Sequence, residues 1–226
     1  MNQKLKWGII GLGWIAEHFA NGLRGCRTGE LVAVASRSLD KARKFAARHG
    51  GARAHGSYED LVNDPGVQIV YVATPHTMHA EWSVRAAEAG KHVLCEKPLA
   101  MNHTEATALM NAVRPLNVFF MEAFMYRIHP QTLKLIELLR QRAIGDVCMI
   151  QSTHSFRAKY DPAHRLFDKD LGGGAILDVG CYDVSVSRLI AGVAGVAGGG
   201  ELAEPTTWRA ARTWTSTAWT IGRPGR

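Results

Sequence analysis

Apolar runs and helix-forming segments alternate along the first 120 or so residues of the chain. Each run is short and rich in Val, Ile, Ala or Phe, as expected of strands that are buried on both faces of a parallel sheet. The segments between the runs predict helices, so residues 1–121 indicate a doubly wound α/β domain with a parallel Rossmann sheet. The predicted strands span residues 6–11, 30–36, 67–74, 91–97 and 117–124.

The predicted helices carry the usual start and stop residues. Ser38 precedes a helix over residues 39–49 that Gly50 ends, and Ser57 with Asp60 three positions later resembles a capping box. Further helices are predicted over residues 14–23, 78–89 and 103–113.

The pattern changes after residue 121. Pro130 opens a predicted helix, residues 147–156 alternate like a strand with one exposed side, and residues 175–192 are typical of another helix. From about residue 191 the chain becomes rich in Gly and Ala and shows no clear periodicity. We therefore expect residues 122–226 to form a partial substrate and oligomerisation α+β domain with an irregular tail.

Composition narrows the class of protein. Hydrophobic residues make up 46% of the chain and charged residues 21%, which suits a soluble globular protein. The four cysteines form no C-x-x-C pair, so reduced thiols and a cytoplasmic location are expected rather than a disulfide framework or a zinc site. We expect no membrane span and no secretory signal peptide.

The net charge of +7 raises the question of nucleic acid, but the basic residues are dispersed and accompany no nucleic-acid-binding motif. The densest basic set lies on the helix predicted over residues 39–49, where it forms a solvated face or attracts a small phosphorylated ligand. This set consists of Lys41, Arg43, Lys44 and Arg48.

A glycine-rich turn stands between the first predicted strand and the first helix. Gly11, Gly13 and Ala16 form the pattern G-x-G-x-x-A, which in this context indicates a dinucleotide-binding βαβ unit. The first glycine permits the tight turn, the second lets the backbone approach a pyrophosphate, and Ala16 keeps helix and strand close. The N-terminus of the helix offers free N–H groups to that phosphate.

The end of the second strand predicts which dinucleotide binds. A site for NAD carries Asp or Glu there to bind the ribose 2′-hydroxyl, whereas this chain carries Ser36, Arg37 and Ser38. Hydroxyl groups and a guanidinium suit a 2′-phosphate, which arginine binds in bidentate geometry. The sequence therefore predicts NADP as the cofactor.

Four motifs in this order resemble the Gfo/Idh/MocA oxidoreductases, most of all the branch of dimeric dihydrodiol dehydrogenase and NADP-dependent D-xylose dehydrogenase. They are G-x-G-x-x-A, "VATPHTMH", "EKP" and "GGGAILDVGCY", and "EAFMYRIHPQ" also looks like that branch. The resemblance covers about residues 5–190. It implies a second domain with a large, mostly antiparallel sheet and an active site between the domains. Members of the family continue well past the end of this sequence, so we expect that domain to be incomplete.

The resemblance also implies roles for individual residues. Lys97 of E-K-P would contact the substrate hydroxyl close to the nicotinamide, where an ammonium stabilises an oxygen that loses its proton. Asp178 would bind substrate hydroxyls, and Tyr182 would act as the acid/base. A phenol titrates near pH 10, and a neighbouring ammonium such as Lys97 would lower that pKa. On spacing alone, Asp178 and Tyr182 could equally be ordinary residues of one helix face.

Other residues are expected to line the cofactor by the same resemblance. A metal pair of His76 and His79 is not expected, because no third ligand is evident. Arg127 could equally form a structural ion pair. The expected lining residues are Thr74, Pro75, His76, Glu96, Lys97 and Arg127.

These features predict an NADP-dependent dehydrogenase that transfers a hydride between nicotinamide and a hydroxyl-bearing carbon of a sugar or of a cyclic or vicinal diol. We expect a small-molecule substrate and, if the sheet of the second domain forms, a homodimer. The alternative from another class is a catalytically silent NADP-binding protein or fragment.

Overall fold

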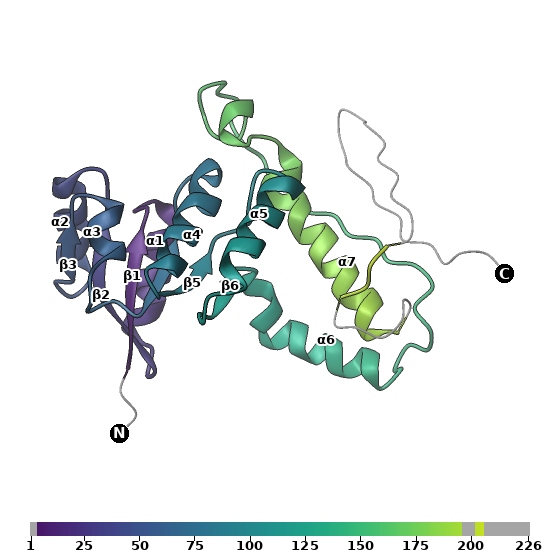
Figure 1. Ribbon diagram of the computed structural model, residues 1–226. Helices are drawn as coiled ribbons and strands as arrows, with labels where there is room; N and C mark the ends of the chain where they lie inside the picture. Colours follow the sequence, from purple (N-terminus) through teal and green to yellow (C-terminus); the bar gives the residue numbers. More distant parts are fainter. Residues whose placement is uncertain (1–3, 196–201, 206–226) are drawn as a thin grey trace. The chain divides into compact units, whose positions relative to one another are not determined.

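A computed structural model of the chain describes residues 4–195 and 202–205. The chain divides into two compact units, Met1–Ala123 and Phe124–Arg226 (Figure 1). The sequence pattern placed the domain boundary after residue 121.

The first unit is built on a six-stranded, all-parallel sheet with the order β3-β2-β1-β4-β5-β6 (Figure 1). This order confirms the predicted doubly wound Rossmann sheet, and the strand order reverses between β1 and β4. The strands are β1 (Leu5–Ile10), β2 (Gly29–Ala35), β3 (Arg53–His55), β4 (Ile69–Val72), β5 (His92–Cys95) and β6 (Phe120–Glu122). The short strand β3 was not predicted.

Helices cover both faces of this sheet, because neighbouring residues of each strand point to opposite sides. Ile9 packs with residues of α1 (Trp14–Arg24) and α2 (Leu39–Arg48) in one core. Ile10 faces the other core, with α3 (Tyr58–Val62), α4 (His79–Glu88) and α5 (His103–Val113). The predicted helix starts at Ser38 and Ser57 are confirmed, since each side chain accepts a hydrogen bond from a backbone N–H of the first turn.

A polar cluster ties the segment before β4 to β3. The Asp64 carboxylate accepts hydrogen bonds from Arg53 Nε at 2.8 Å and from Gly66 N at 2.7 Å, and it lies 3.0 Å from His55 Nε2. Burial alone would raise the pKa of Asp64, but the hydrogen bonds from Arg53, Gly66 and His55 outweigh it and hold that pKa below its usual value.

All regular secondary structure of the second unit, over its described residues, is helical. Its elements are the 3₁₀ turns η2 (Met125–Ile128) and η3 (Lys169–Leu171), α6 (Pro130–Arg140), the π-helical turn η4 (Ile176–Gly180) and α7 (Cys181–Val193). The helix predicted over residues 175–192 is confirmed, although it opens with a π turn and ends at Val193.

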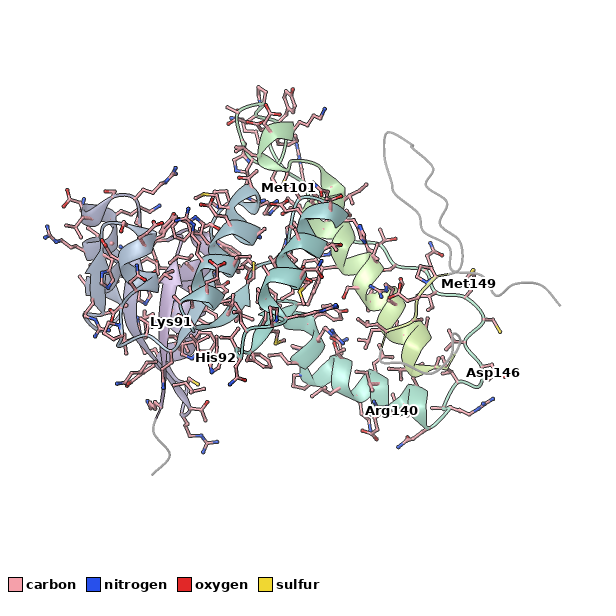
Figure 2. All side chains as sticks on the ribbon, in the orientation of Figure 1. Lys91, His92, Met101, Arg140, Asp146 and Met149 are labelled. Carbon is pink, nitrogen blue, oxygen red and sulfur yellow. The ribbon has the colours of Figure 1, made fainter. Side chains whose placement is uncertain are left out.

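The strand predicted over residues 147–156 is wrong. This segment, with Met149 exposed on it (Figure 2), pairs with no other strand, and the described residues of the second unit contain no strand at all. Alternation can indicate a strand, but a strand needs a partner to satisfy its backbone groups. The antiparallel sheet that the resemblance implies is therefore not seen in the described part, and most of the predicted tail lies outside it.

None of the helices among residues 4–195 and 202–205 has the length and apolar character that crossing a membrane requires.

Candidate active site and cofactor site

The glycine turn lies at the carboxyl end of β1, beside the point where the strand order reverses. Gly11 has a φ of +84°, which favours glycine, and a Cβ there would lie 2.5 Å from the carbonyl oxygen of Ala73. The residue must be glycine because β1 and the end of β4 approach too closely for any side chain.

Gly13 stands in the opposite kind of environment. It caps α1 in an extended conformation, and a Cβ built on it would meet no atom within 4 Å. The N–H groups of the first turn of α1 therefore border open space, as an anion-binding helix N-terminus requires. Ala16, on the other side of the turn, is fully buried between α1 and the sheet.

The end of β2 presents the residues expected to meet a 2′-phosphate. Ser36 is buried and its Oγ accepts a hydrogen bond from Ser38 N, while Ser38 caps α2. Arg37 is exposed and hydrogen-bonds to the Tyr58 side chain, the first residue of α3. Burial raises the pKa of Tyr58, so its hydroxyl stays protonated and holds the guanidinium as a neutral acceptor.

A cavity of about 410 Å³ opens beside Ser38. Three basic side chains of α2 line the cavity, although the sequence pattern favoured a solvated face for this helix. The cavity is lined by Leu12, Ser38, Asp40, Lys41, Lys44, Phe45 and Arg48. An anionic ligand fits this lining better than an apolar one.

The turn after β4 carries the "TPH" residues. Thr74 is buried, and its hydroxyl oxygen meets no hydrogen-bond partner among the described residues. Pro75 is exposed and begins the 3₁₀ turn η1 (His76–Met78), and His76 is buried within that turn. An unsatisfied buried hydroxyl is costly without a ligand or water, which supports the prediction that this turn lines a cofactor.

The E-K-P turn follows β5 at the next strand end. Glu96 is buried, with Oε1 accepting a hydrogen bond from the Tyr71 hydroxyl at 2.5 Å and Oε2 accepting one from Lys97 N at 3.3 Å. Lys97 is partly exposed. The carboxylate of Glu96 therefore holds its own turn, and its predicted contact with the cofactor stays a prediction.

In the second unit, Asp178 lies in the π turn and is buried. Its Oδ1 accepts a hydrogen bond from Arg165 Nη1 at 3.1 Å, and Arg165 itself is about half exposed. An ionised carboxylate accepts hydrogen bonds at both of its oxygens, which suits the predicted role of binding hydroxyl groups.

Tyr182 stands at the second position of α7 within an aromatic cluster. Its ring meets Phe124, Tyr126 and His154 edge to face, with centroids 5.4, 6.1 and 5.5 Å away. The Tyr126 hydroxyl pairs with Ser185 Oγ at 2.7 Å. Burial raises the pKa of Tyr126, and the Ser185 hydrogen bond and the charge of Arg127, which is partly buried in η2, oppose that shift.

The described residues bring no three His, Cys, Asp or Glu side chains together as a metal site would need.

Two family models match the chain. The one described as an oxidoreductase family with an NAD-binding Rossmann fold matches residues 5–124, and the GFO/IDH/MocA C-terminal domain matches residues 132–214. The chain belongs to the Gfo/Idh/MocA oxidoreductase family. The predicted resemblance is confirmed.

Relatives within the Gfo/Idh/MocA family include well-defined dehydrogenases. A trans-1,2-dihydrobenzene-1,2-diol dehydrogenase from Xenopus laevis is 42% identical over 82% of this chain and 56% of its own length. A D-xylose 1-dehydrogenase (NADP(+)) from Haloferax volcanii is 42% identical over 72% of this chain and 50% of its own length.

Solved structures of the family agree. The crystal structure of a 3-ketoreductase from Actinomadura kijaniata, in complex with NADP and TDP-benzene, has a TM-score of 0.74 and 34% identity. The match covers 83% of this chain and 57% of that one. This chain therefore spans about half the length of the relatives it matches.

Sequence reasoning missed several residues that hold the Gfo/Idh/MocA motifs in place. Tyr58 holds Arg37, Tyr71 holds Glu96, and two further groups described below hold the E-K-P turn. These residues belong to helix starts and strand interiors, where the sequence pattern indicates packing. No spacing rule could have singled them out.

Proposed function

We propose that the protein is an NADP-dependent oxidoreductase that transfers a hydride between nicotinamide and a hydroxyl-bearing carbon of a sugar or diol. The observation that carries the proposal is the arrangement along one sheet edge. The glycine turn after β1, Ser36–Ser38 after β2, the Thr74 turn after β4 and Lys97 after β5 all stand at carboxyl ends of parallel strands. In open α/β sheets, ligands bind outside these strand ends, at the point where the strand order reverses.

The residues present fit a dinucleotide. The open space beside Gly13 would admit a pyrophosphate. Thr74, in the turn after β4, offers a hydroxyl donor that is buried and unsatisfied. Arg37 and Ser38, beside a cavity with basic side chains, support NADP over NAD because they suit a 2′-phosphate. The D-xylose dehydrogenase and the 3-ketoreductase among the relatives carry NADP in their names.

The proposed chemistry is the oxidation of a hydroxyl-bearing carbon, or its reverse. When bound, the nicotinamide accepts the hydride from that carbon. Tyr182 removes the hydroxyl proton, Lys97 stabilises the negative charge that develops on the oxygen, and Asp178 orients a neighbouring hydroxyl. The buried position of Asp178 and its hydrogen bond from Arg165 support a binding role for that carboxylate.

Two measurements test this proposal. The unsubstituted chain is titrated with NADPH and NADH by fluorescence, and it is assayed for turnover on D-xylose and on a trans-dihydrodiol with NADP. We expect tighter binding of NADPH and measurable turnover, with Lys97→Ala and Tyr182→Phe each removing most activity while NADPH still binds. Tighter binding of NADH would refute the cofactor assignment, and full activity of both variants would refute the assigned roles.

A second candidate is a protein that binds NADP without turnover. The described part of the second unit, which contains no strand, favours this candidate. NADPH binding without turnover on any substrate of the panel would support this candidate. The expected homodimer and cytoplasmic location stay predictions, and light scattering on the purified chain checks the former.

A further inference from the structure

The E-K-P turn and the Thr74 turn lie at neighbouring strand ends. β4 and β5 are paired in parallel, with Val72 opposite Cys95. Thr74 therefore leaves the sheet beside Glu96 and Lys97, and both turns carry residues that the proposed function assigns to the cofactor and the substrate. What fixes one turn against the other decides where the Lys97 ammonium can be placed.

His79 joins these two turns. It is the first residue of α4 and is only 1% exposed. Its Nδ1 lies 2.7 Å from the carbonyl oxygen of Pro98, and its Nε2 lies 2.9 Å from the carbonyl oxygen of Thr74. One buried ring thus bridges the residue that follows Lys97 and the residue expected to line the cofactor.

Lys97 is held on its other side as well. Glu96 Oε2 accepts a hydrogen bond from Lys97 N, and Glu122 Oε1, on β6, accepts one from Leu99 N at 2.8 Å. The Glu96 side chain of the same turn therefore anchors the backbone at the lysine, and Glu122 from β6 anchors it two residues later. Because a long lysine side chain is flexible by itself, an anchored backbone restricts where its ammonium can reach.

The ring of His79 can satisfy its two neighbours only in part while it is neutral. A neutral imidazole carries one N–H donor, whereas both of its neighbours are carbonyl acceptors. Burial lowers the pKa of His79, and the carbonyls of Pro98 and Thr74 oppose that shift. The shorter contact, to Pro98, is the better candidate for the donated hydrogen bond.

We propose that His79 is a positioning residue for Lys97, acting through the Pro98 carbonyl. This inference rests on the proposed function for the catalytic part of its test. It does not rest on it for the contacts themselves, which can be measured without turnover.

Two substitutions separate the two contacts. Asparagine places an amide nitrogen as many bonds from Cβ as Nδ1, so His79→Asn keeps a donor for Pro98. Glutamine places its nitrogen as far out as Nε2, so His79→Gln places a donor at the Thr74 carbonyl and loses the one for Pro98. We expect His79→Gln to lower kcat by about 10- to 100-fold, the cost of a misplaced catalytic group. The dissociation constant of NADPH should change by less than about threefold.

His79→Asn keeps the donor for Pro98, so kcat at saturating cofactor and the dissociation constant of NADPH should both stay within a few-fold of the parent. His103, exposed at the start of α5, provides matched controls: His103→Gln and His103→Asn should leave both quantities unchanged. Equal losses of kcat in the two His79 variants, or an unchanged kcat in His79→Gln, would overturn the proposal.

A second measurement remains decisive if the variants fail to fold or the parent shows no turnover. In the unsubstituted chain, labelled with ¹⁵N-histidine, we expect a slowly exchanging imidazole N–H on Nδ1 of His79, assigned by its absence in His79→Gln or by sequential assignment. A rapidly exchanging or unprotonated Nδ1 would overturn the proposal. Absence of turnover in the parent, with the protected N–H present, would count against the proposed function and leave the positioning contact standing.

Discussion

The two glycines of the dinucleotide turn should respond in opposite ways to the same substitution. In Gly11→Ala, a residue with a φ of +84° acquires a Cβ, and that Cβ would lie 2.5 Å from a backbone oxygen of Ala73. A left-handed conformation costs a non-glycine residue about 1–2 kcal/mol, and overpacking against backbone adds about 1–3 kcal/mol. We therefore expect Gly11→Ala to lose about 2–5 kcal/mol of unfolding free energy.

Gly13→Ala should leave the fold almost unchanged. Its φ of −94° suits alanine, and the new Cβ meets no atom within 4 Å. Replacing a glycine N-cap by alanine costs roughly 0.5–1 kcal/mol, and the less flexible unfolded chain returns about 0.4–1 kcal/mol. The methyl group would instead occupy the space through which a pyrophosphate approaches. Loss of one hydrogen bond to a charged group is worth about 1.5–3 kcal/mol, which corresponds to roughly 10- to 100-fold weaker NADPH binding.

Urea unfolding followed by tryptophan fluorescence measures the first effect, and NADPH fluorescence titration measures the second. The two variants form a matched pair, since each adds a single methyl group within the same turn. A Gly13→Ala variant that binds NADPH like the parent would refute the pyrophosphate site. A Gly13→Ala variant as unstable as Gly11→Ala would refute the open space before that residue.

Three further predictions follow from individual contacts. Tyr58→Phe removes the hydroxyl that holds Arg37, so NADPH binding should weaken by about 2- to 10-fold while NADH binding stays constant; an equal change for both cofactors in the titration would contradict this. The pKa of Asp64 is lowered in the folded state, so its contribution to stability is present at neutral pH and is lost as the pH falls through that lowered pKa. Asp64→Asn should cost about 1–3 kcal/mol at pH 7 and flatten the acid side of the urea-unfolding profile, and an unchanged profile would contradict the role of the carboxylate. Burial raises the pKa of the Cys95 thiol to about 12, so Cys95 should resist alkylation in the folded chain while exposed Cys148 reacts, as peptide mass spectrometry can show.

The first unit could be predicted because most residues of its strands are apolar, so the sequence itself indicates that these strands are buried. β4 is an uninterrupted run of Ile, Val and Tyr, β1 is apolar apart from Lys6 and Gly8, and the caps at Ser38 and Ser57 lie where the sequence pattern placed them. β3 was missed because it is only three residues long, Arg-Ala-His, and owes its strand conformation to pairing with β2. The local sequence pattern does not indicate a strand whose conformation depends on pairing with a neighbouring strand.

In the second unit the sequence pattern predicts a strand that the described structure does not contain. Residues 147–156 alternate like a strand, yet they form no regular secondary structure and no strand pairs with them among the described residues. The π turn at Ile176–Gly180 was also beyond the sequence pattern, because helical periodicity does not distinguish a local insertion at the start of a helix. It changes the register between Asp178 and the residues of α7, so four-residue spacing alone does not place Asp178 and Tyr182 on one face.

The motif residues of the candidate site fall into two groups, according to whether they are exposed or form buried hydrogen bonds. Gly13 borders open space, Arg37 is exposed and Lys97 is partly exposed. Glu96 and His79, which stand in the same motifs, are buried and form hydrogen bonds within the protein. The contacts of the second group join residues that are 25 and 19 positions apart in the chain, so only the sheet order brings them together. A motif therefore predicts that a site exists more reliably than it predicts which of its residues touches the ligand. Substitutions of Gly13, Arg37 or Lys97 should therefore change binding or turnover with little loss of stability. Substitutions of Glu96 should lower stability and activity together, because removal of its buried carboxylate takes that acceptor from the Tyr71 hydroxyl.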